Sequence, residues 1–222
     1  MIVYEIVGNE THPAYQALAI ANLDRQYDFL RSIVAASLTL DRLMLSIEVI
    51  KALNYHAISC LHTNAGEFRP CDVFLPSGLA LPAPHRVPAL MAMFVDEVNR
   101  GWGEPGFDPV ATAAYVLWRL NVIHPFINGN GRTARVACYF VICLALGGWL
   151  PGTTLLPELI RQNRATYVAA LQAADASVAA GNPPDLTALH ALLVFLLSQQ
   201  LASATPPPAP PGPPAALPAP AP

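Results

Sequence analysis

Apolar residues recur every three to four positions along most of the chain before Thr205, and this spacing is typical of packed amphipathic helices. It holds in residues 13–30, with interruptions in residues 33–61, and again in residues 87–100 and 185–203. No alternation of strands with helices appears, which disfavours a doubly wound α/β fold. The sequence therefore predicts an all-α fold, mainly a helical bundle.

Residues 65–84 interrupt that helical pattern. Short apolar stretches are separated there by Gly and Pro, in the string AGEFRPCDVFLPSGLALPAP. Such punctuation is typical of a small hairpin or an irregular flap. We therefore expect the helical bundle to carry a small β-hairpin flap.

The composition changes sharply at Thr205. The last 17 residues hold ten of the 23 prolines, and a segment of this kind cannot form a packed core. We expect residues 1–204 to form a single helical domain and residues 205–222 to be a disordered, Pro/Ala-rich tail. The tail could bind an aromatic groove on a partner protein, although we favour an inert tail.

Apolar content and cysteine usage bear on where the protein works. The chain is 54% apolar, but its longest apolar run, Val136–Leu146, is far shorter than the ~20 residues of a membrane-spanning helix. The N-terminus lacks the basic region and cleavage site of a signal peptide. The four cysteines form no CxxC pair and no zinc-ligand spacing, which favours free buried thiols. We predict a cytoplasmic protein that does not bind a membrane.

The charge balance argues against two further classes of function. The net charge is -3 and the pI about 6.0, so no basic excess is present to hold nucleic acid phosphates, and we expect no nucleic acid binding. Lys51 is the one lysine in the sequence, and no GxxxxGK[ST] phosphate-binding loop can be written around it.

The segment that indicates chemistry is HPFINGNGRTAR, residues 124–135, which lies between two apolar helices. Gly129 and Gly131 allow the backbone to approach a ligand closely. Asn130 is expected to be the N-cap of the following helix. The free N–H groups in the first turn of that helix form a site that attracts anions.

Arg132 and Arg135 lie in the same helical turn, where a positive charge opposes the helix dipole. Two arginines at this unfavourable end are explained if an anion, such as a polyphosphate, lies between them and the backbone N–H groups. His124 ends the preceding helix, and its imidazole can act as a base near neutral pH. Together these residues predict a functional site.

The string GNGRTA also fits the GxGxxA fingerprint of dinucleotide-binding folds. That fingerprint requires a preceding strand and an acidic residue about 20 positions later. The preceding segment is helical in pattern, and the next acidic residue is Glu158. We therefore reject dinucleotide binding.

With these residues established, HPFINGNGRTAR closely resembles the HPFx[D/E]GNGRxxR signature of Fic (Fido) domains. The resemblance extends to AGEFRP at residues 65–70, ATAAYVLWRLNVIHPF at 111–126 and RATYVAALQAAD at 164–175, and it covers roughly residues 45–180. Fic domains are helical and mostly transfer AMP from ATP, with magnesium, to a hydroxyl of a target protein. The resemblance implies that this chain is a protein adenylyltransferase that modifies Ser, Thr or Tyr.

The resemblance also implies roles for single residues. His124 would be the catalytic general base on the target hydroxyl. Asn130, with the N–H groups around Gly129 and Gly131, would hold the α-phosphate. The two motif arginines, Arg132 and Arg135, would hold the β- and γ-phosphates, which leave as pyrophosphate.

Two further groups of residues are implied with less specific motifs. Asn163 and Tyr167 are candidates for the adenosine side of the nucleotide, and a plain core role for Tyr167 is equally open. The flap would align a segment of the target protein by strand pairing. Its docking residues would be Asp72, Val73, Phe74 and Leu75.

Asn128 departs from the family pattern, which usually has Asp or Glu there as the magnesium ligand. Asn offers one neutral carbonyl oxygen, and a unit charge pair about 4 Å apart is worth roughly 4 kcal/mol at an effective dielectric near 20. We therefore expect Asn128 to be part of a weakened Mg²⁺ site. Weak catalysis, transfer of a different phospho-group, and an inactive nucleotide- or protein-binding module all stay open.

Regulation is the last point on which the sequence bears. Many Fic proteins carry an inhibitory helix with the pattern [S/T]xxxE[G/N], and no Ser or Thr of this chain begins such a pattern. We expect either a separate, antitoxin-like inhibitory protein or no inhibitor. A structural helical domain whose proline tail recruits partners is a further hypothesis, which the motif disfavours.

Overall fold

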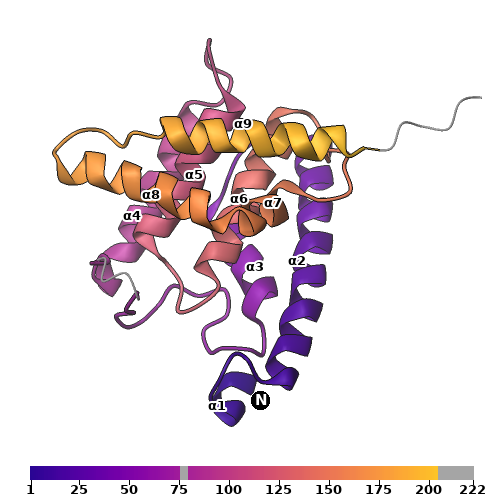
Figure 1. Cartoon of the computed structure of the whole chain (residues 1–222), viewed down its shortest axis with the longest axis vertical. Helices are drawn as coiled ribbons and strands as arrows, with labels where there is room; N and C mark the ends of the chain where they lie inside the picture. Colours follow the sequence, from indigo (N-terminus) through magenta and orange to yellow (C-terminus); the bar gives the residue numbers. More distant parts are fainter. Residues whose placement is uncertain (76–79, 205–222) are drawn as a thin grey trace, which may run out of the picture.

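The computed structural model describes residues 1–75 and 80–204, and within these ranges the chain is helical (Figure 1). The predicted disordered tail, residues 205–222, lies outside the described residues. The helices, in chain order, are α1 (Val3–Val7), α2 (Pro13–Thr39), α3 (Ile47–Ile58), the short 3-10 turn η1 (Pro84–Arg86), α4 (Val87–Arg100), α5 (Pro109–Ile123), α6 (Asn130–Ala145), α7 (Leu156–Gln162), α8 (Arg164–Ala179) and α9 (Thr187–Ala202).

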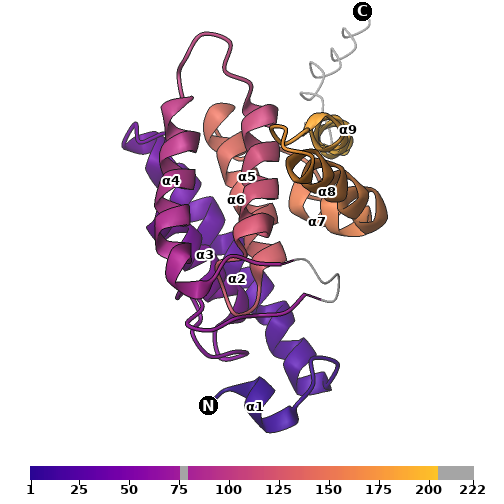
Figure 2. The same cartoon turned by 90° about the vertical axis from the view of Figure 1, so that its left-hand side faces the viewer.

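Helices α5 and α6 form the centre of the bundle and pack side by side (Figure 2). Every residue of α6 from Val136 to Leu144 is buried, which confirms that this apolar run is a core helix. Helix α5 begins as predicted, because the Asp108 carboxylate accepts hydrogen bonds from the N–H groups of Val110 and Ala111. The two central helices are joined by the loop that carries the HPFINGNGRTAR motif.

The long helix α2 packs against α3 and α6 on one side of the centre, while α7, α8 and α9 gather on another (Figures 1 and 2). Buried amides fasten α2 to α3: the side chain of Gln26 donates to the Leu53 carbonyl at 2.8 Å, and that of Asn22 donates to the Ser59 carbonyl at 2.8 Å. This packing fixes the first turn of α2 near the motif loop.

The predicted β-hairpin flap is wrong, because the described part of residues 65–84 contains no strand. The segment is held by Arg69, whose side chain is buried and donates to the carbonyls of His124, Cys71 and Pro82. Prolines at positions 70, 82 and 84 lack the N–H group that a strand ladder requires. Two of the carbonyls bound by Arg69, those of Cys71 and Pro82, lie in the segment predicted as a hairpin, and one guanidinium binds both.

The structure bears on two further expectations, that no helix spans a membrane and that the cysteines are free and buried. Across residues 1–75 and 80–204, no helix combines the length and apolar character required to span a bilayer. The four cysteines are unpaired, as expected. Only Cys138 and Cys143 are buried, whereas Cys60 and Cys71 are exposed, so the expectation that all four are buried is wrong.

Candidate active site

The motif loop is shaped by two residues in the left-handed conformation. His124 caps the C-terminus of α5 with a φ of 50°, and Gly129 precedes α6 with a φ of 76°. Between them Phe126 is fully buried and anchors the loop in the core. The chain therefore leaves α5, turns sharply and re-enters a helix within six residues, which brings the end of α5 and the start of α6 to one cavity.

Asn130 is not the N-cap that the sequence predicted; the cap position is Gly129, and Asn130 is the first residue of α6. Its side chain is 4% exposed and bridges back across the loop. The carboxamide oxygen accepts from the N–H of Phe126 at 2.9 Å, and the carboxamide nitrogen donates to the Phe126 carbonyl at 2.8 Å. Asn130 therefore fixes the shape of the loop, and within the described residues no side chain caps the first turn of α6.

Gly129 is required for a second reason besides its positive φ. A Cβ atom there would lie 2.6 Å from Cγ2 of Ile58 and 3.0 Å from the side-chain nitrogen of Asn54, both on α3. The buried Asn54 side chain donates to the Asn128 carbonyl at 2.9 Å and accepts from the Gly66 N–H at 3.0 Å. The close approach that the glycine permits is thus to α3.

The imidazole of His124 is oriented by the end of its own helix. Its Nδ1 lies 3.4 Å from the carbonyl oxygen of Asn121, and because a carbonyl only accepts, Nδ1 carries the proton in this contact. The other ring nitrogen, Nε2, then has a free lone pair. Burial lowers the pKa of His124, partly offset by the Asn121 contact, so the ring is neutral at pH 7. A neutral imidazole at the cavity can accept a proton.

The two motif arginines line the same cavity but differ in their partners. Arg132 donates to the Ala57 carbonyl at the end of α3 at 2.9 Å and to Oδ1 of Asn128 at 3.3 Å. Arg135 is more enclosed, and burial lowers its pKa. Within the described parts of the chain, neither arginine has a carboxylate within 4.0 Å. Two positive charges without an ionic partner favour an anionic ligand.

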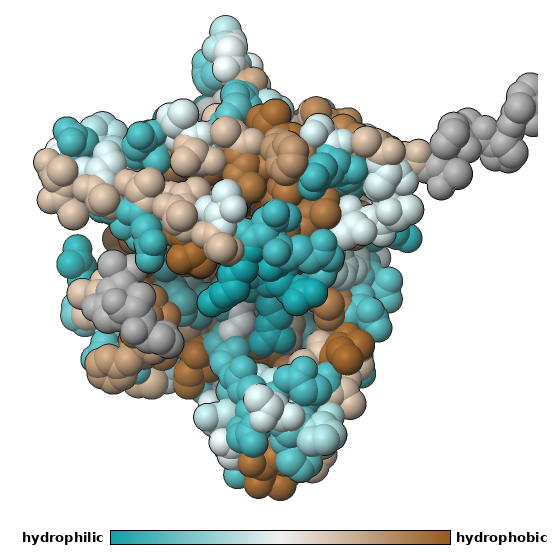
Figure 3. Space-filling model, in the orientation of Figure 1, coloured by the Kyte–Doolittle hydropathy of each residue, from teal (hydrophilic) through white to brown (hydrophobic). Residues whose placement is uncertain are grey.

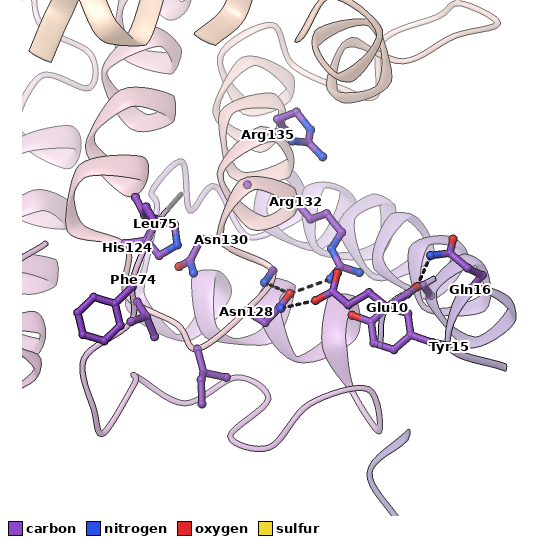
Figure 4. Close-up of a pocket in the computed structure, with 15 residues that line it drawn as sticks. Glu10, Tyr15, Gln16, Phe74, Leu75, His124, Asn128, Asn130, Arg132 and Arg135 are labelled. Atoms are coloured by element: carbon purple, nitrogen blue, oxygen red, sulfur yellow. Dashed lines mark hydrogen bonds between the residues drawn. The ribbon is translucent and has the colours of Figure 1, made fainter. Parts of the chain in front are cut away.

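These residues surround a cavity of about 530 Å³ (Figure 4). The face that contains α6 and α7 is hydrophilic at its centre, below a hydrophobic patch over α9 (Figure 3). A smaller cavity of about 200 Å³ shares Ala19, Arg132 and Arg135 with the larger one. The residues that line the larger cavity are Glu10, Tyr15, Gln16, Ala19, Val73, Phe74, Leu75, His124, Ile127, Asn128, Gly129, Asn130, Gly131, Arg132 and Arg135.

The structure brings most of the predicted site residues together, but not all of them. Asp72 is exposed and lies 4.0 Å from the Arg69 guanidinium, outside the cavity lining. Tyr167 is 5% exposed, and its hydroxyl accepts from the Asn121 side chain at 2.8 Å. The Asn163 side chain donates to the Leu159 carbonyl at the junction of α7 and α8. Neither adenosine candidate lines the cavity, so their nucleotide role stays a prediction.

Sequence reasoning missed the wall that the N-terminal region contributes. Glu10 precedes α2, and Tyr15, Gln16 and Ala19 lie in its first two turns, yet all four line the cavity. No motif marked this segment, and it lies outside the stretch that resembles Fic domains. The buried Asn54 and Arg69, which position the motif loop, were also missed; the Arg of AGEFRP was the available signal for Arg69.

Magnesium requires oxygen ligands, and the side chains around Asn128 offer few free ones. Oδ1 of Asn128 accepts from the Gly129 N–H at 2.6 Å and from Arg132, so its one ligating oxygen is already engaged. No group of three His, Cys, Asp or Glu side chains suited to a metal occurs among the described residues. Magnesium is usually held by one or two carboxylates together with substrate phosphates, and the Glu10 carboxylate adjoins Asn128 (Figure 4). The residues fit a metal that arrives with a nucleotide.

The model of the Fic/DOC family matches residues 44–142, which contain the motif loop, its flanking helices and Arg69. This part of the chain is therefore similar to the Fic/DOC family. This confirms the resemblance drawn from the motif. A Fic-domain-containing signaling protein from Bacteroides thetaiotaomicron has the same fold, with a TM-score of 0.65 at 22% identity over 90% of this chain and 75% of that one. Fic-1 from C. elegans gives a TM-score of 0.60 at 23% identity, over 83% and 48% of the two chains.

Two curated relatives are named protein adenylyltransferases. Protein adenylyltransferase Fic of Drosophila willistoni is 41% identical over 71 residues, 32% of this chain and 14% of the relative. Protein adenylyltransferase fic-1 of Caenorhabditis briggsae is 34% identical over 112 residues, 50% of this chain and 20% of the relative. This chain therefore spans about a fifth or less of the length of these relatives.

Proposed function

We propose that this Fic/DOC-domain chain is a protein adenylyltransferase, which transfers AMP from ATP to a Ser, Thr or Tyr hydroxyl of a target protein. The observation that carries the proposal is that His124, Arg132, Arg135 and the first residues of α6 line one cavity. The names of the curated relatives support the same activity.

In this proposal the triphosphate lies at the start of α6. The first-turn N–H groups would receive the α-phosphate, because the helix dipole favours negative charge there. Arg132 and Arg135 would bind the β- and γ-phosphates, and the enclosed guanidinium of Arg135 would gain the counter-charge that it lacks. Magnesium, when bound with the nucleotide beside Asn128, would offset part of the phosphate charge.

His124 would remove the proton from the target hydroxyl through Nε2. The hydroxyl oxygen then forms a bond to the α-phosphorus, the bond from that phosphorus to the oxygen bridging to the β-phosphate breaks, and pyrophosphate leaves. The contact of Nδ1 with the Asn121 carbonyl would hold the ring in the required tautomer and stabilise the imidazolium that forms. The target itself would approach past the exposed segment that contains Phe74.

The test is transfer of label from ATP labelled at either the α- or the γ-phosphate, with cell lysate as the source of targets and with magnesium. We expect protein bands that carry the α-label and not the γ-label, and no bands with the His124→Ala variant. Bands that carry the γ-label would show transfer of a different group and contradict the proposal.

A second candidate function is nucleotide binding without transfer. The engaged Oδ1 of Asn128 favours it, because the motif position that usually contributes a charged ligand offers no free oxygen here. ATP binding by the intact chain, without protein labelling in any lysate fraction or magnesium concentration, would support this candidate over the transferase.

A further inference from the structure

Among the described residues, one acidic side chain lines the large cavity, that of Glu10, and it lies outside the family match at residues 44–142. Glu10 lies in the turn between α1 and α2, and its Oε1 accepts from the side-chain nitrogen of Asn128 at 3.0 Å (Figure 4). Its other neighbour is His62, whose Nε2 lies 3.4 Å away. A carboxylate therefore stands directly beside the motif position at which the charge is missing.

The turn that carries Glu10 is held in place by several bonds. The Thr11 N–H and hydroxyl both donate to the Asn9 side chain at 2.6 Å, and Gln16 donates to the Glu10 carbonyl. Helix α1 is itself tied to the end of α3, because the Val3 N–H donates to the Cys60 carbonyl at 2.9 Å. The position of Glu10 beside Asn128 is thus built by the fold of the N-terminal region.

The contacts of Asn128 show that Glu10, and not Asn128, can present an oxygen to a cation. Its Oδ1 faces two donors, the Gly129 N–H and Arg132, so the amide cannot turn over without placing its NH₂ group against them. Its nitrogen, which cannot ligate a cation, faces Glu10. The Glu10 carboxylate is about half exposed, and its polar side-chain contacts in the described part of the chain are this amide and the His62 imidazole. Among the described residues, no Lys or Arg side chain forms a salt bridge with this carboxylate.

We propose that Glu10 is the carboxylate ligand of a divalent cation that enters with the nucleotide, in place of the acid that Asn128 lacks. The inference rests on the proposed nucleotide site. Metal binding by Glu10 explains why a carboxylate lines a cavity that we propose to bind phosphates. Without a cation, the Glu10 carboxylate would repel the triphosphate. With a cation, it would bind the same metal ion that the phosphates bind. One carboxylate plus phosphate oxygens is a set that magnesium commonly accepts.

The test measures metal binding directly, with Mn²⁺ as the probe. Free Mn²⁺ is followed by electron paramagnetic resonance as it is titrated into the full chain with a non-hydrolysable ATP analogue. Glu10→Gln keeps the size of the side chain and removes the charge, and we expect Mn²⁺ to bind about tenfold more weakly. Glu5→Gln is the matched control, since Glu5 is exposed on α1 and does not line the cavity.

A second arm uses the double variant Glu10→Gln with Asn128→Asp. This variant moves the negative charge from position 10 to the adjoining position 128, and it should restore Mn²⁺ affinity to within about threefold of the parent chain. If Glu10 had only a structural role, the added Asp would not restore Mn²⁺ binding. A third arm measures the ATP analogue in EDTA by calorimetry. Without metal, the effect of the substitution on affinity should be the opposite: the Glu10→Gln variant should bind the analogue as tightly as the parent chain or more tightly.

Three results would overturn the inference. Unchanged Mn²⁺ affinity in a folded Glu10→Gln variant would show that the carboxylate is not a ligand. Tighter nucleotide binding by that variant both with and without metal would make Glu10 an obstructing residue instead. If the parent chain binds the analogue in neither condition, the proposed function fails first, and the inference fails with it.

Discussion

The cavity has two unlike walls. The wall formed by the motif loop is fixed from behind by buried side chains: Asn130 bridges the loop, Asn54 ties it to α3, and Arg69 holds the His124 carbonyl. The rest of the lining, here called the exposed wall, comes from two separate segments, residues 73–75 and the turn at Glu10, in which the Phe74 and Glu10 side chains are exposed. The difference separates two tasks. Reacting groups require fixed positions, whereas contacts with a partner or a metal–nucleotide complex form when these arrive.

The largest effect should come from the fixed wall. His124→Ala removes the proposed base, and transfer of the α-label should fall by about 10²- to 10⁴-fold. ATP affinity, measured by calorimetry, should stay within about twofold, because the ring is expected to contact the target hydroxyl and not the phosphates. The control is His85→Ala, an exposed residue that does not line the cavity. Equal loss of ATP binding would place His124 in the nucleotide site instead.

Next in size is a change that alters the fixed wall from behind. Gly129→Ala combines a left-handed backbone with a methyl group pressed against Ile58, and we expect a loss of about 2–4 kcal/mol in the free energy of unfolding, measured with urea. Gly181→Ala has a similar φ of +82° with no atom within 4 Å of the added Cβ, so it should cost only about 1–2 kcal/mol. Equal losses would mean that contact with α3 does not position the loop.

On the exposed wall, Phe74→Ala should leave stability within about 0.5 kcal/mol, because the side chain is 93% exposed. If Phe74 contacts the target, KM for the target protein should rise by up to about tenfold with kcat unchanged. Phe195→Ala, at an exposed site on α9, is the control. A fall in kcat would show that the exposed wall also positions reacting groups.

The smallest expected effect is a displacement of the pH profile. The base must be neutral to act, and burial lowers the pKa of His124, so activity should be kept at neutral pH and lost as the pH falls through that lowered pKa. The acidic limb of kcat/KM should therefore lie below the value of about 6.5 for an unperturbed histidine. An acidic limb above 6.5 would mean that another group titrates or that the ring is stabilised in its charged form.

The two walls also differ in how far the sequence predicted them. The helical class, the Asp108 cap and the burial of Val136–Leu144 followed from local patterns, because apolar spacing and capping chemistry act within one element. The motif loop was located correctly, but the role of Asn130 as a cap was not. Its carboxamide bonds with Phe126 depend on a turn made of two left-handed residues, and nothing local predicts that turn.

The wrong or missing predictions mostly concern the exposed wall, residues 73–75 and the turn at Glu10. The hairpin predicted for residues 65–84 is absent from their described part, where the buried Arg69 guanidinium binds the carbonyls of Cys71 and Pro82. Glu10 could not be predicted because it lies 118 positions from Asn128 in the sequence. Contacts of that kind are created by the packing of α2 on α3 and α6, and local sequence does not encode them.

Calorimetry of ATP with magnesium measures whether the start of α6 binds the triphosphate of ATP, as we propose. The intact chain should bind ATP, and Arg135→Ala should weaken binding by about tenfold or more, since a buried charge-assisted contact is lost. Arg100→Ala, an exposed residue at the end of α4, should bind ATP like the parent chain. No heat of binding with the intact chain, or equal ATP affinity of the Arg135→Ala variant, would exclude a triphosphate site at the start of α6.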